Sequence, residues 1–344
     1  MKICVCSAQT PFVYGGTEIF VENMIAQFRL RGHDAEMVRL PLQTQPHEEL
    51  LKSCLAWRLL NLDFVELERI DMVIPVKFPA YMVRHENKRI WLLHQYRQIY
   101  DLYETAYTSF QPTSKDNEIR KYIIDLDQES FRESKKVFAQ SRTVADRLKR
   151  SIGMEAEILQ PPISDSDAFY SESMDSHVLS VARLAGNKRV HLLIEAMQYV
   201  SECFHAVIVG DGYARAELEK LTAKLKLGNR VHFAGQISRE EVIRHYAKAG
   251  AVFYGPVEED YGLATLEAFY ARKPVITCSD SGGVLELVDD SCGWIATTQP
   301  QSIASCIEEA LNNKNKSRQM GEEGFQKISY LSWNYVMDRL LAEL

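Results

Sequence analysis

The sequence predicts an α/β fold of two successive domains, each with a parallel β-sheet covered by helices on both faces. Short apolar runs alternate with helical patterns along the chain, as they do in proteins with parallel sheets. The 344 residues are about twice the length of an ordinary domain. Around residues 159–176 the alternation gives way to proline, serine and aspartate and then starts again. We therefore expect two α/β domains with a ligand-binding cleft between them.

In the first half of the chain, apolar β-branched runs predict strands, and apolar residues at helical spacing predict helices. The first strand, over residues 2–8, leads through a polar loop into a helix over 17–31, where Phe20 and Met24 lie on one face. The other elements expected here are strands at 35–40, 71–76, 89–94 and 136–140 and helices at 50–64, 119–133 and 143–151.

After the polar segment the alternation restarts with a strand over 177–182. We expect the first domain to cover residues 1–165, the second 166–327, and a terminal amphipathic helix within 328–344 to pack back on the first domain. The remaining elements expected in the second domain are strands at 205–209, 230–233, 251–254, 274–277 and 294–296 and helices at 190–200, 214–225, 239–249, 263–271 and 301–312.

Composition excludes several classes of protein. Apolar residues make up 46% and charged residues 25%, which excludes collagen-like and disordered chains. A net charge of -7 argues against a nucleic-acid partner, which needs a broad basic face. No apolar run is long enough for a membrane span or a signal peptide, so we expect a cytoplasmic protein. The seven cysteines have neither disulfide-framework nor zinc-site spacing.

The clearest motif lies where the strand at 251–254 passes into the next helix. Glu259 is in the connecting loop, Gly262 begins the helix, and Glu267 lies one turn inside it. The free N–H groups of a helix start favour a phosphate, and carboxylates suit the hydroxyls of a sugar or ribose. Two glutamates eight residues apart also arise by chance, so spacing alone leaves a solvated loop acid and a surface helix charge as the alternative.

The wider context of this motif resembles a known enzyme family. Residues 259–267, Glu-Asp-Tyr-Gly-Leu-Ala-Thr-Leu-Glu, are similar to the Glu-x7-Glu signature of retaining GT-B glycosyltransferases of family 4 (glycosyltransferase group 1), with Tyr261 for the commoner Phe. Residues 179–189 resemble the family's Gly-Arg-Leu-x-x-x-Lys-Gly run, with Ala182 and Arg189 replacing two glycines. Further similarities cover residues 207–213, 231–237 and 273–286.

The resemblance implies a GT-B fold of two Rossmann-like α/β/α domains and assigns roles in a donor site. Arg183 and Lys188 would stabilise the charge that builds on the leaving diphosphate. Glu259 would hold the hydroxyls of the donor sugar, and Glu267 those of the ribose. The other substrate-binding residues implied in this domain are Gln236 and Ile237, whose backbone would pair with the base edge, and Tyr261, Gly262, Leu263 and Ala264.

The first domain has fewer recognisable features. Gly15 and Gly16 follow the first strand and resemble the family's Gly-Gly loop, which approaches a phosphate or the acceptor; a simple turn is the alternative. His94 ends a strand, where the family has a histidine that contacts the donor sugar. Aromatic residues recur at helical spacing over 96–110 and predict a helix with an aromatic face, for the core or for an acceptor sugar. The expected helix over 50–64 packs on the sheet or touches a membrane.

The implied activity is transfer of a sugar with retention from a nucleoside diphosphate to an acceptor hydroxyl, in polysaccharide or glycoconjugate synthesis. UDP-glucose is the first donor expected, without a metal, and the acceptor is an unknown sugar or lipid-linked sugar. We expect a front-face displacement, and a nucleophilic role of Glu259 stays open. Two Asp-x-Asp pairs, at 165–167 and 125–127, lie in a linker and within a helix, not at strand ends where a metal-bound diphosphate would sit.

Three other functions fit the predicted architecture. A GT-B epimerase or hydrolase acting on a UDP-sugar would share the fold, but the Glu-x7-Glu match argues against it. A non-catalytic nucleotide-sugar binding protein would keep Arg183 and Glu267 without turnover. A nicotinamide oxidoreductase would need the GxGxxG fingerprint, which is absent after the first strand.

Overall fold

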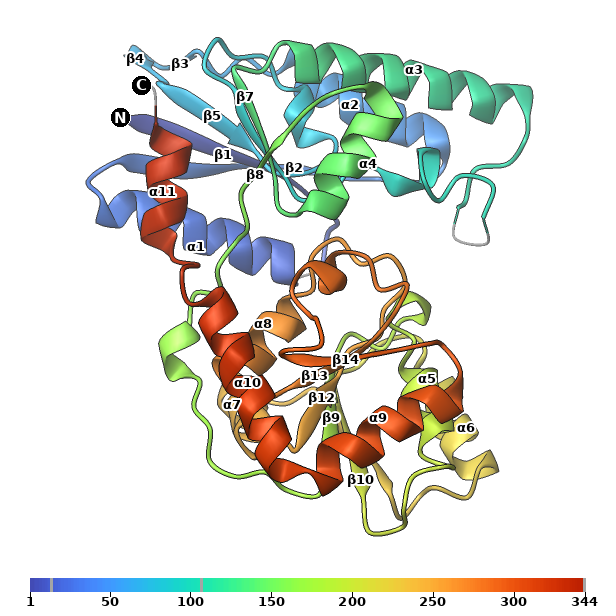
Figure 1. Ribbon diagram of the computed structural model, residues 1–344. Helices are drawn as coiled ribbons and strands as arrows, with labels where there is room; N and C mark the ends of the chain where they lie inside the picture. The colour runs from blue at the N-terminus through green and yellow to red at the C-terminus, as the bar shows by residue number, and fades with distance from the viewer. Residues whose placement is uncertain (13–14, 106–107, 343–344) are drawn as a thin grey trace. The chain divides into compact units, whose positions relative to one another are not determined.

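The computed structural model describes residues 1–12, 15–105 and 108–342 and divides into two compact units (Figure 1). The first unit comprises Met1–Pro161 together with Ser332–Leu344, and the second comprises Pro162–Leu331. Each unit contains its own parallel sheet with hydrophobic residues packed on both faces. Among the described residues, no helix is long and apolar enough to cross a membrane.

The sheet of the first unit consists of two three-stranded parallel ladders, β2-β1-β5 and β6-β7-β8. The ladders meet where the N–H of Leu93 donates to the carbonyl of Val76 at 2.8 Å. Chain connections diverge between β1 and β5, so loops after these two strands share one edge of the sheet. The strands are β1 (Lys2–Gln9), β2 (Asp34–Pro41), β5 (Met72–Pro75), β6 (Arg89–Leu92), β7 (Lys136–Ala139) and β8 (Glu157–Ile158).

Helices cover both faces of this sheet (Figure 1). On one face, the ring of Phe20 lies 4.8 Å from Trp91 and 6.0 Å from Trp333, which joins the last helix of the chain to the sheet. Arg31 adds an ion pair to Asp338 at 2.6 Å. The helices on this face are α1 (Gly16–Leu30) and α11 (Trp333–Leu341); those on the other are α2 (His47–Leu59), α3 (Ser114–Arg132) and α4 (Arg142–Ile152).

The predicted aromatic helix over 96–110 is wrong. Among the described residues of this segment, 96–105 and 108–110, only the single turn Arg97–Ile99 is helical. Serine and threonine side chains compete for the backbone in this segment; the hydroxyl of Thr108, for example, donates to the carbonyl of Gln98 at 2.9 Å. Phe110 is buried in the core, and Tyr107 lies outside the described residues.

The helix expected over 50–64 ends earlier than its pattern indicates. Leu50, Cys54 and Trp57 are fully buried on α2, so this helix packs on the sheet. After Leu59 the chain forms a short antiparallel hairpin of β3 (Phe64–Val65) and β4 (Glu68–Arg69).

The second unit contains one six-stranded parallel sheet in the order β11-β10-β9-β12-β13-β14. Counted within this unit, the order is 3-2-1-4-5-6, that of a Rossmann fold. Connections from β9 run outward on one side, and those from β12 run outward on the other. The strands are β9 (His177–Val181), β10 (His205–Val209), β11 (Val231–Gly235), β12 (Ala251–Phe253), β13 (Val275–Cys278) and β14 (Gly293–Ala296).

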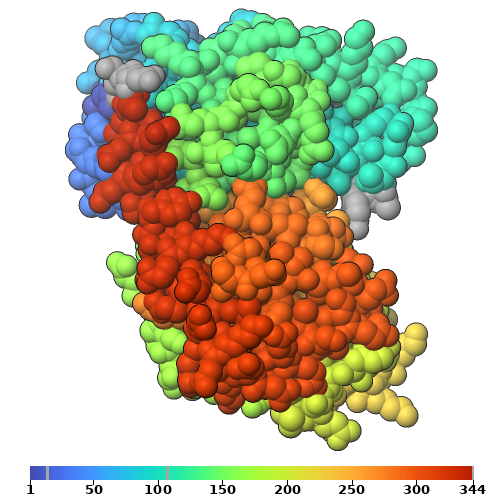
Figure 2. Space-filling model, in the orientation of Figure 1, coloured from blue at the N-terminus to red at the C-terminus, as the bar shows by residue number. Residues whose placement is uncertain are grey.

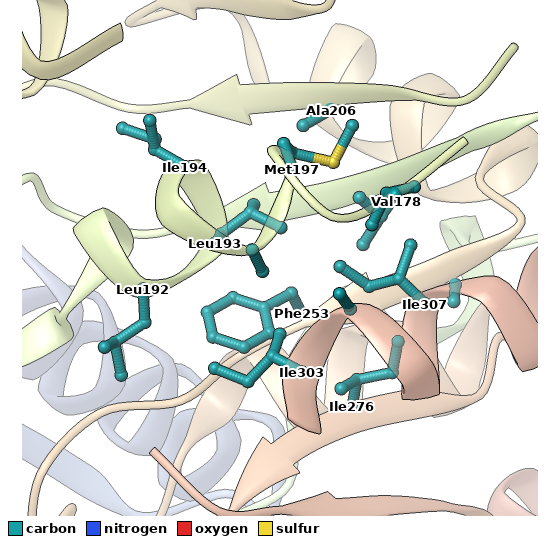
Figure 3. Packing of buried hydrophobic residues seen from close by; sticks show 14 of the residues in the cluster. Val178, Leu192, Leu193, Ile194, Met197, Ala206, Phe253, Ile276, Ile303 and Ile307 are labelled. Carbon is teal, nitrogen blue, oxygen red and sulfur yellow. The ribbon is translucent and has the colours of Figure 1, made fainter. Parts of the chain in front are cut away.

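Two hydrophobic clusters hold the helices of the second unit to its sheet. In one of them, Leu193, Phe253 and Ile303 converge from α5, β12 and α9 (Figure 3). Helices in contact with this first cluster are α5 (Val190–Ala196), α6 (Arg215–Lys224) and α9 (Pro300–Asn312); those on the opposite face are α7 (Arg239–Lys248) and α8 (Leu263–Tyr270).

The sequence pattern did not predict α10 (Lys314–Ile328). This helix contributes to both clusters through Met320 and Ile328, and with α9 it forms part of the surface in Figure 2. Its Gly324 lies so close to the ring of Phe269 that a Cβ would come within 2.3 Å of that ring. Close packing of glycines thus replaces the regular apolar stripe by which a helix is recognised in sequence.

Candidate functional site

The expected donor-site residues of the second unit gather at the carboxyl edge of its sheet. Arg183 and Lys188 follow β9, and Glu259 follows β12. These two strands are neighbours at the point where chain connections diverge. In open α/β sheets the crevice outside this point is where ligands bind.

Lys188, Glu259 and Tyr254 form a compact cluster at this edge. The ammonium of Lys188 pairs with the carboxylate of Glu259, and each side chain is 16% exposed. The hydroxyl of Tyr254 lies 3.1 Å from both groups. Burial, and then the neighbouring Glu259, raises the pKa of Tyr254 well above its ordinary value, so this side chain remains a neutral donor. The sequence identified Lys188 and Glu259 but not Tyr254.

The backbone of the loop that carries Glu259 is fixed against a second turn. The N–H of Gly283 donates to the carbonyl of Glu259 at 2.7 Å, and Glu259 and Gly282 form a parallel bridge. Gly282 has a φ of 60°, and a Cβ on it would lie 2.6 Å from the Glu259 carbonyl oxygen. This turn therefore requires glycine for its conformation and its closeness to the loop.

Helix α8 begins immediately after this loop. Gly262, with a φ of 93°, precedes its first residue Leu263, and the N–H groups of Leu263 and Ala264 have no acceptor within the helix. Leu263 is exposed and Ala264 is half-buried, so an anion can approach here. The side chain of Tyr261 is 1% exposed and lies in the core. Tyr261 can therefore contact a substrate only through its main chain.

Glu267 is held by two side chains that the sequence analysis missed. Arg239 donates to one carboxylate oxygen of Glu267 at 2.6 Å, and the hydroxyl of Tyr246 donates to the other at 2.9 Å. Arg239 also donates to both oxygens of Asp165, at 2.6 and 2.9 Å, and this pairing lowers the pKa of Asp165 although burial acts to raise it. Asp165 thus serves as an arginine partner.

Three other expected residues of the second unit lie at or near strand ends, and their side chains are exposed or half-buried. Gln236 is exposed and Ile237 half-buried in the turn between β11 and α7. The side chain of Arg183 is exposed, and it has no hydrogen-bond or ion-pair partner in the part of the chain that the structure describes. Arg183 is therefore available to an anionic ligand.

In the first unit, the structure brings Gly15 and His94 to the same edge of the sheet. The N–H of Gly15 donates to the buried carboxylate of Glu18 at 2.9 Å, whose other oxygen lies 3.4 Å from the ammonium of Lys77. Lys77 and His94 form a parallel bridge. Gly16 is the exposed first residue of α1. Glu18 and Lys77 are new to this site, although Glu18 lies only two residues after Gly16 in sequence.

The hydrogen bonding of His94 defines what its ring can do. Nδ1 lies 2.8 Å from the carbonyl of Gln95, and because a carbonyl only accepts, Nδ1 carries the proton. In the neutral ring Nε2 is then an acceptor, and within residues 1–12, 15–105 and 108–342 no group bonds to it. Nε2 of His94 can therefore accept a hydrogen bond from a hydroxyl group.

Neither Asp-x-Asp pair belongs to a metal-ligand cluster. Asp127 is fully buried and accepts from the hydroxyls of Tyr81 and Tyr100 at 2.9 and 2.7 Å. Within the described ranges, no group of three or more His, Cys, Asp or Glu side chains is arranged to hold a metal ion.

Comparison with known proteins places this site in a family context. The family described as "Glycosyl transferases group 1" matches residues 165–327, which include every site residue discussed in the second unit. The chain is 26% identical over 183 residues to the O-antigen chain mannosyltransferase RfbU of Salmonella typhimurium, covering 52% of each protein. It is 30% identical over 151 residues to the alpha-D-kanosaminyltransferase of Streptomyces kanamyceticus, covering 42% of this chain and 39% of that protein. The chain spans about half the length of the curated relatives it matches.

Solved structures match over nearly the full chain. The sucrose-phosphate synthase of Thermosynechococcus elongatus has a TM-score of 0.79 at 18% identity, covering 98% of this chain and 97% of that one. Anabaena HepE in complex with UDP and glucose has a TM-score of 0.74 at 16% identity, covering 99% and 98%. At these identities the likeness establishes the fold, in which two parallel α/β sheets follow one another along the chain.

Proposed function

Because the chain belongs to the glycosyl transferases group 1 family and has the GT-B fold, we propose that it transfers a sugar, with retention, from a nucleoside diphosphate to an acceptor hydroxyl. The observation that carries this proposal is the Lys188–Glu259–Tyr254 cluster. It lies, like Arg183, at the carboxyl edge of the second sheet, where the chain connections after β9 and β12 diverge. A cation for a diphosphate and a carboxylate for sugar hydroxyls meet there in one place.

The donor site is proposed to stabilise negative charge on the diphosphate more strongly in the transition state than in the bound substrate. Arg183 and Lys188 bind the diphosphate and stabilise the negative charge that grows on it as the glycosidic bond breaks. The N–H groups at Gly262, Leu263 and Ala264 add the positive end of a helix. These groups supply the charge that a metal supplies in other transferases, so we propose that the reaction needs no metal.

Recognition of the rest of the donor follows from the remaining contacts. Glu259 accepts hydrogen bonds from hydroxyls of the sugar, and the ammonium of Lys188, its ion-pair partner, contacts the adjoining phosphate. Glu267, which is oriented by Arg239 and Tyr246, accepts hydrogen bonds from both ribose hydroxyls. Backbone groups of Gln236 and Ile237 pair with the edge of the base.

The first unit is proposed to supply the remaining contacts to the substrates. Nε2 of His94 accepts a hydrogen bond from a hydroxyl of the donor sugar, because the Nδ1 proton is donated to the carbonyl of Gln95. The Gly15–Gly16 turn, held by Glu18, offers backbone donors to the acceptor or to a phosphate.

We propose a front-face displacement for the chemical step. The bond from the anomeric carbon to the leaving phosphate oxygen breaks while the acceptor oxygen bonds to the same face, and that phosphate oxygen takes the acceptor's proton. Glu259 is engaged with Lys188 and Tyr254, so it is better arranged to orient the sugar than to attack it. Trapping of a glycosylated Glu259 with a slow donor would reverse this assignment.

The donor proposed first is UDP-glucose. One structure of HepE, a neighbour in fold, holds UDP-glucose, whereas RfbU and human ALG2 are mannosyltransferases by name. UDP-glucose and a GDP-linked mannose are therefore the two donors to compare. The acceptor is proposed to be a sugar hydroxyl, free or lipid-linked, and the cytoplasmic location expected from the sequence stays a prediction.

Calorimetric titration of UDP, GDP and ADP, with and without EDTA, tests the donor site. We expect one nucleotide to bind in EDTA and to bind at least about tenfold more weakly to Arg183→Ala and Glu267→Ala. Arg244→Ala, an exposed arginine on α7, is the matched control and should bind as the wild type does.

Product analysis then separates the candidate functions. Release of the nucleotide with a new glycosidic bond supports the proposal, and a changed sugar epimer or free sugar alone would indicate an epimerase or a hydrolase. Binding without turnover of any donor would leave a nucleotide-sugar binding protein, and binding of no nucleotide would remove the proposal altogether.

A further inference from the structure

Arg189, which follows Lys188 directly, has an unusual backbone conformation. Its φ and ψ are 50° and 37°, in the left-handed region, at the junction between the turn Gly186–Lys188 and helix α5. Side chains rarely adopt this conformation, and glycine usually occupies such a position. An arginine at this position implies that its side chain compensates for the backbone strain.

The side chain of Arg189 makes at least four hydrogen bonds and is only 12% exposed. Its Nε donates to the carbonyl of Gly255 at 2.9 Å, and one Nη donates to the carbonyl of Pro256 at 2.7 Å. The two Nη groups donate to the two oxygens of Asp280 at 2.7 and 2.6 Å. This pairing also lowers the pKa of Asp280, mainly through the hydrogen bond to Arg189.

These contacts surround the loop that carries Glu259. Gly255 and Pro256 begin this loop, and the carbonyl of Asp280 accepts from the N–H of Glu258 at 3.0 Å. A further bond, from the N–H of Val257 to the carbonyl of Asn187 at 2.9 Å, joins the loop to the turn before Arg189. The guanidinium thus ties the Glu259 loop and the turn that pairs with this loop to Arg189, which is the residue next to Lys188.

We propose that Arg189 is a positioning residue that sets the distance between the Lys188 ammonium and the Glu259 carboxylate. Both groups are proposed to contact one donor molecule, so their separation must match the span from its phosphate to its sugar. Small misplacements of such groups lower the rate strongly. This inference rests on the function proposed above.

The surrounding core indicates that the fold does not depend on Arg189. Strands β9 and β12 pair directly, and α5 is anchored by Leu192, Leu193 and Ile194, all buried. Replacing Arg189 by glycine also relieves the left-handed backbone strain. The Arg189→Gly variant therefore removes the side-chain contacts while it preserves or improves the conformation of the main chain.

The test measures kcat, the donor KM, the dissociation constant of the free nucleotide and the thermal midpoint of Arg189→Gly, Arg189→Lys, Asp280→Asn and the double variant Arg189→Gly/Asp280→Asn. For Arg189→Gly we expect kcat to fall by about 10- to 100-fold with a much smaller change in the affinity for the free nucleotide. Arg189→Lys should regain only part of the rate, because lysine cannot make the bidentate bond to Asp280. The double variant Arg189→Gly/Asp280→Asn should be no slower than Arg189→Gly, since the second change acts through the same contact.

Arg230 is the matched control. Its guanidinium also donates to backbone carbonyls, those of Phe204, Met197, Val200 and Ser201, but it precedes β11 at the amino edge of the sheet. Arg230→Ala should lower the thermal midpoint and leave kcat of the folded protein unchanged. A similar loss of kcat in both variants would mean that the effect of Arg189 is one of general stability.

The outcomes separate this inference from the proposed function. An active wild type together with an Arg189→Gly variant of unchanged kcat would overturn the positioning role alone. A wild type that binds no nucleotide and transfers no sugar would overturn both. An active wild type with a selective loss of kcat in Arg189→Gly, partly recovered in Arg189→Lys, supports the positioning role.

Discussion

The guanidinium of Arg239 donates to the carboxylate of Glu267 at 2.6 Å, although the two residues lie on different helices, α7 and α8. Tyr246 donates to the other carboxylate oxygen at 2.9 Å. Each oxygen of an ionised carboxylate has a second lone pair, so both oxygens of Glu267 can still accept a hydrogen bond from a hydroxyl group. Glu267 is therefore oriented by the protein before a nucleotide binds, which lowers the entropy that binding would otherwise cost.

Removal of this support should weaken nucleotide binding. We expect Arg239→Ala to weaken the binding of the preferred nucleoside diphosphate by about 1 to 2 kcal/mol, because Glu267 loses a charge-assisted hydrogen bond and rotates more freely. Titration calorimetry measures the change. Arg244→Ala, on the same helix, is the control, and equal affinities of the two variants would show that Glu267 does not need Arg239.

Glu259→Gln should separate sugar recognition from nucleotide binding. Glutamine keeps the shape and the bond to Tyr254 but loses the charge that pairs with Lys188 and accepts sugar hydroxyls. We expect kcat to fall by about 100-fold or more, while the affinity for the nucleotide without sugar stays within about twofold of the wild type. Glu258→Gln, the exposed neighbour in the same loop, should retain most of its activity. Weaker binding of the free nucleotide to Glu259→Gln would contradict a role at the sugar.

The sequence predicted the parts of the fold and the site that depend on local patterns. Each predicted strand corresponds to an observed strand, because buried parallel strands are short apolar runs, whereas the two-residue strands β3, β4 and β8 were not predicted. Lys188 and Glu259 are 71 residues apart and were found from separate motifs. They meet because the strands that precede them, β9 and β12, are neighbours in a parallel sheet.

Features set by tertiary contacts could not be predicted in this way. Arg239 and Asp165 lie 74 residues apart, and no local pattern indicates their pairing. The aromatic residues over 96–110 recur at helical spacing, yet the hydroxyl of Thr108 bonds to the backbone, donating to the carbonyl of Gln98 and accepting from the N–H of Phe110, in place of helical hydrogen bonds. Periodicity shows which residues are apolar. It does not show where hydroxyl side chains form hydrogen bonds with the backbone in place of helical hydrogen bonds.

The terminal helix should contribute strongly to the stability of the first unit. Trp333 on α11 is buried and stacks on Phe20 at 6.0 Å. We expect Trp333→Ala to lower the free energy of unfolding by about 3 to 5 kcal/mol, because a large buried side chain leaves a cavity. Urea denaturation followed by circular dichroism measures the loss. Tyr335→Ala, at an exposed position of the same helix, should change it by less than about 1 kcal/mol, and equal losses would contradict the packing argument.

Asp127 should make the stability of the first unit depend on pH. This carboxyl group is fully buried on α3 against the hydroxyls of Tyr81 and Tyr100, close to Gln95 and Cys54. Burial raises its pKa from 3.8 to about 7, although the two tyrosines and Gln95 act to lower it. Between these values the folded state binds more protons than the unfolded state. The free energy of unfolding should therefore fall as the pH rises from about 4 to 7, by up to about 4 kcal/mol.

The variant Asp127→Asn isolates this contribution, because an amide has a similar shape and cannot ionise. Its unfolding free energy, measured in urea at about pH 4.5, 6 and 8, should lack the decrease expected in the wild type, so that the variant gains relative stability as the pH rises. Asp125→Asn, at an exposed position on the same helix, should follow the wild-type profile. Parallel profiles for Asp127→Asn and the wild type would show that folding does not raise the pKa of Asp127, and would contradict this prediction.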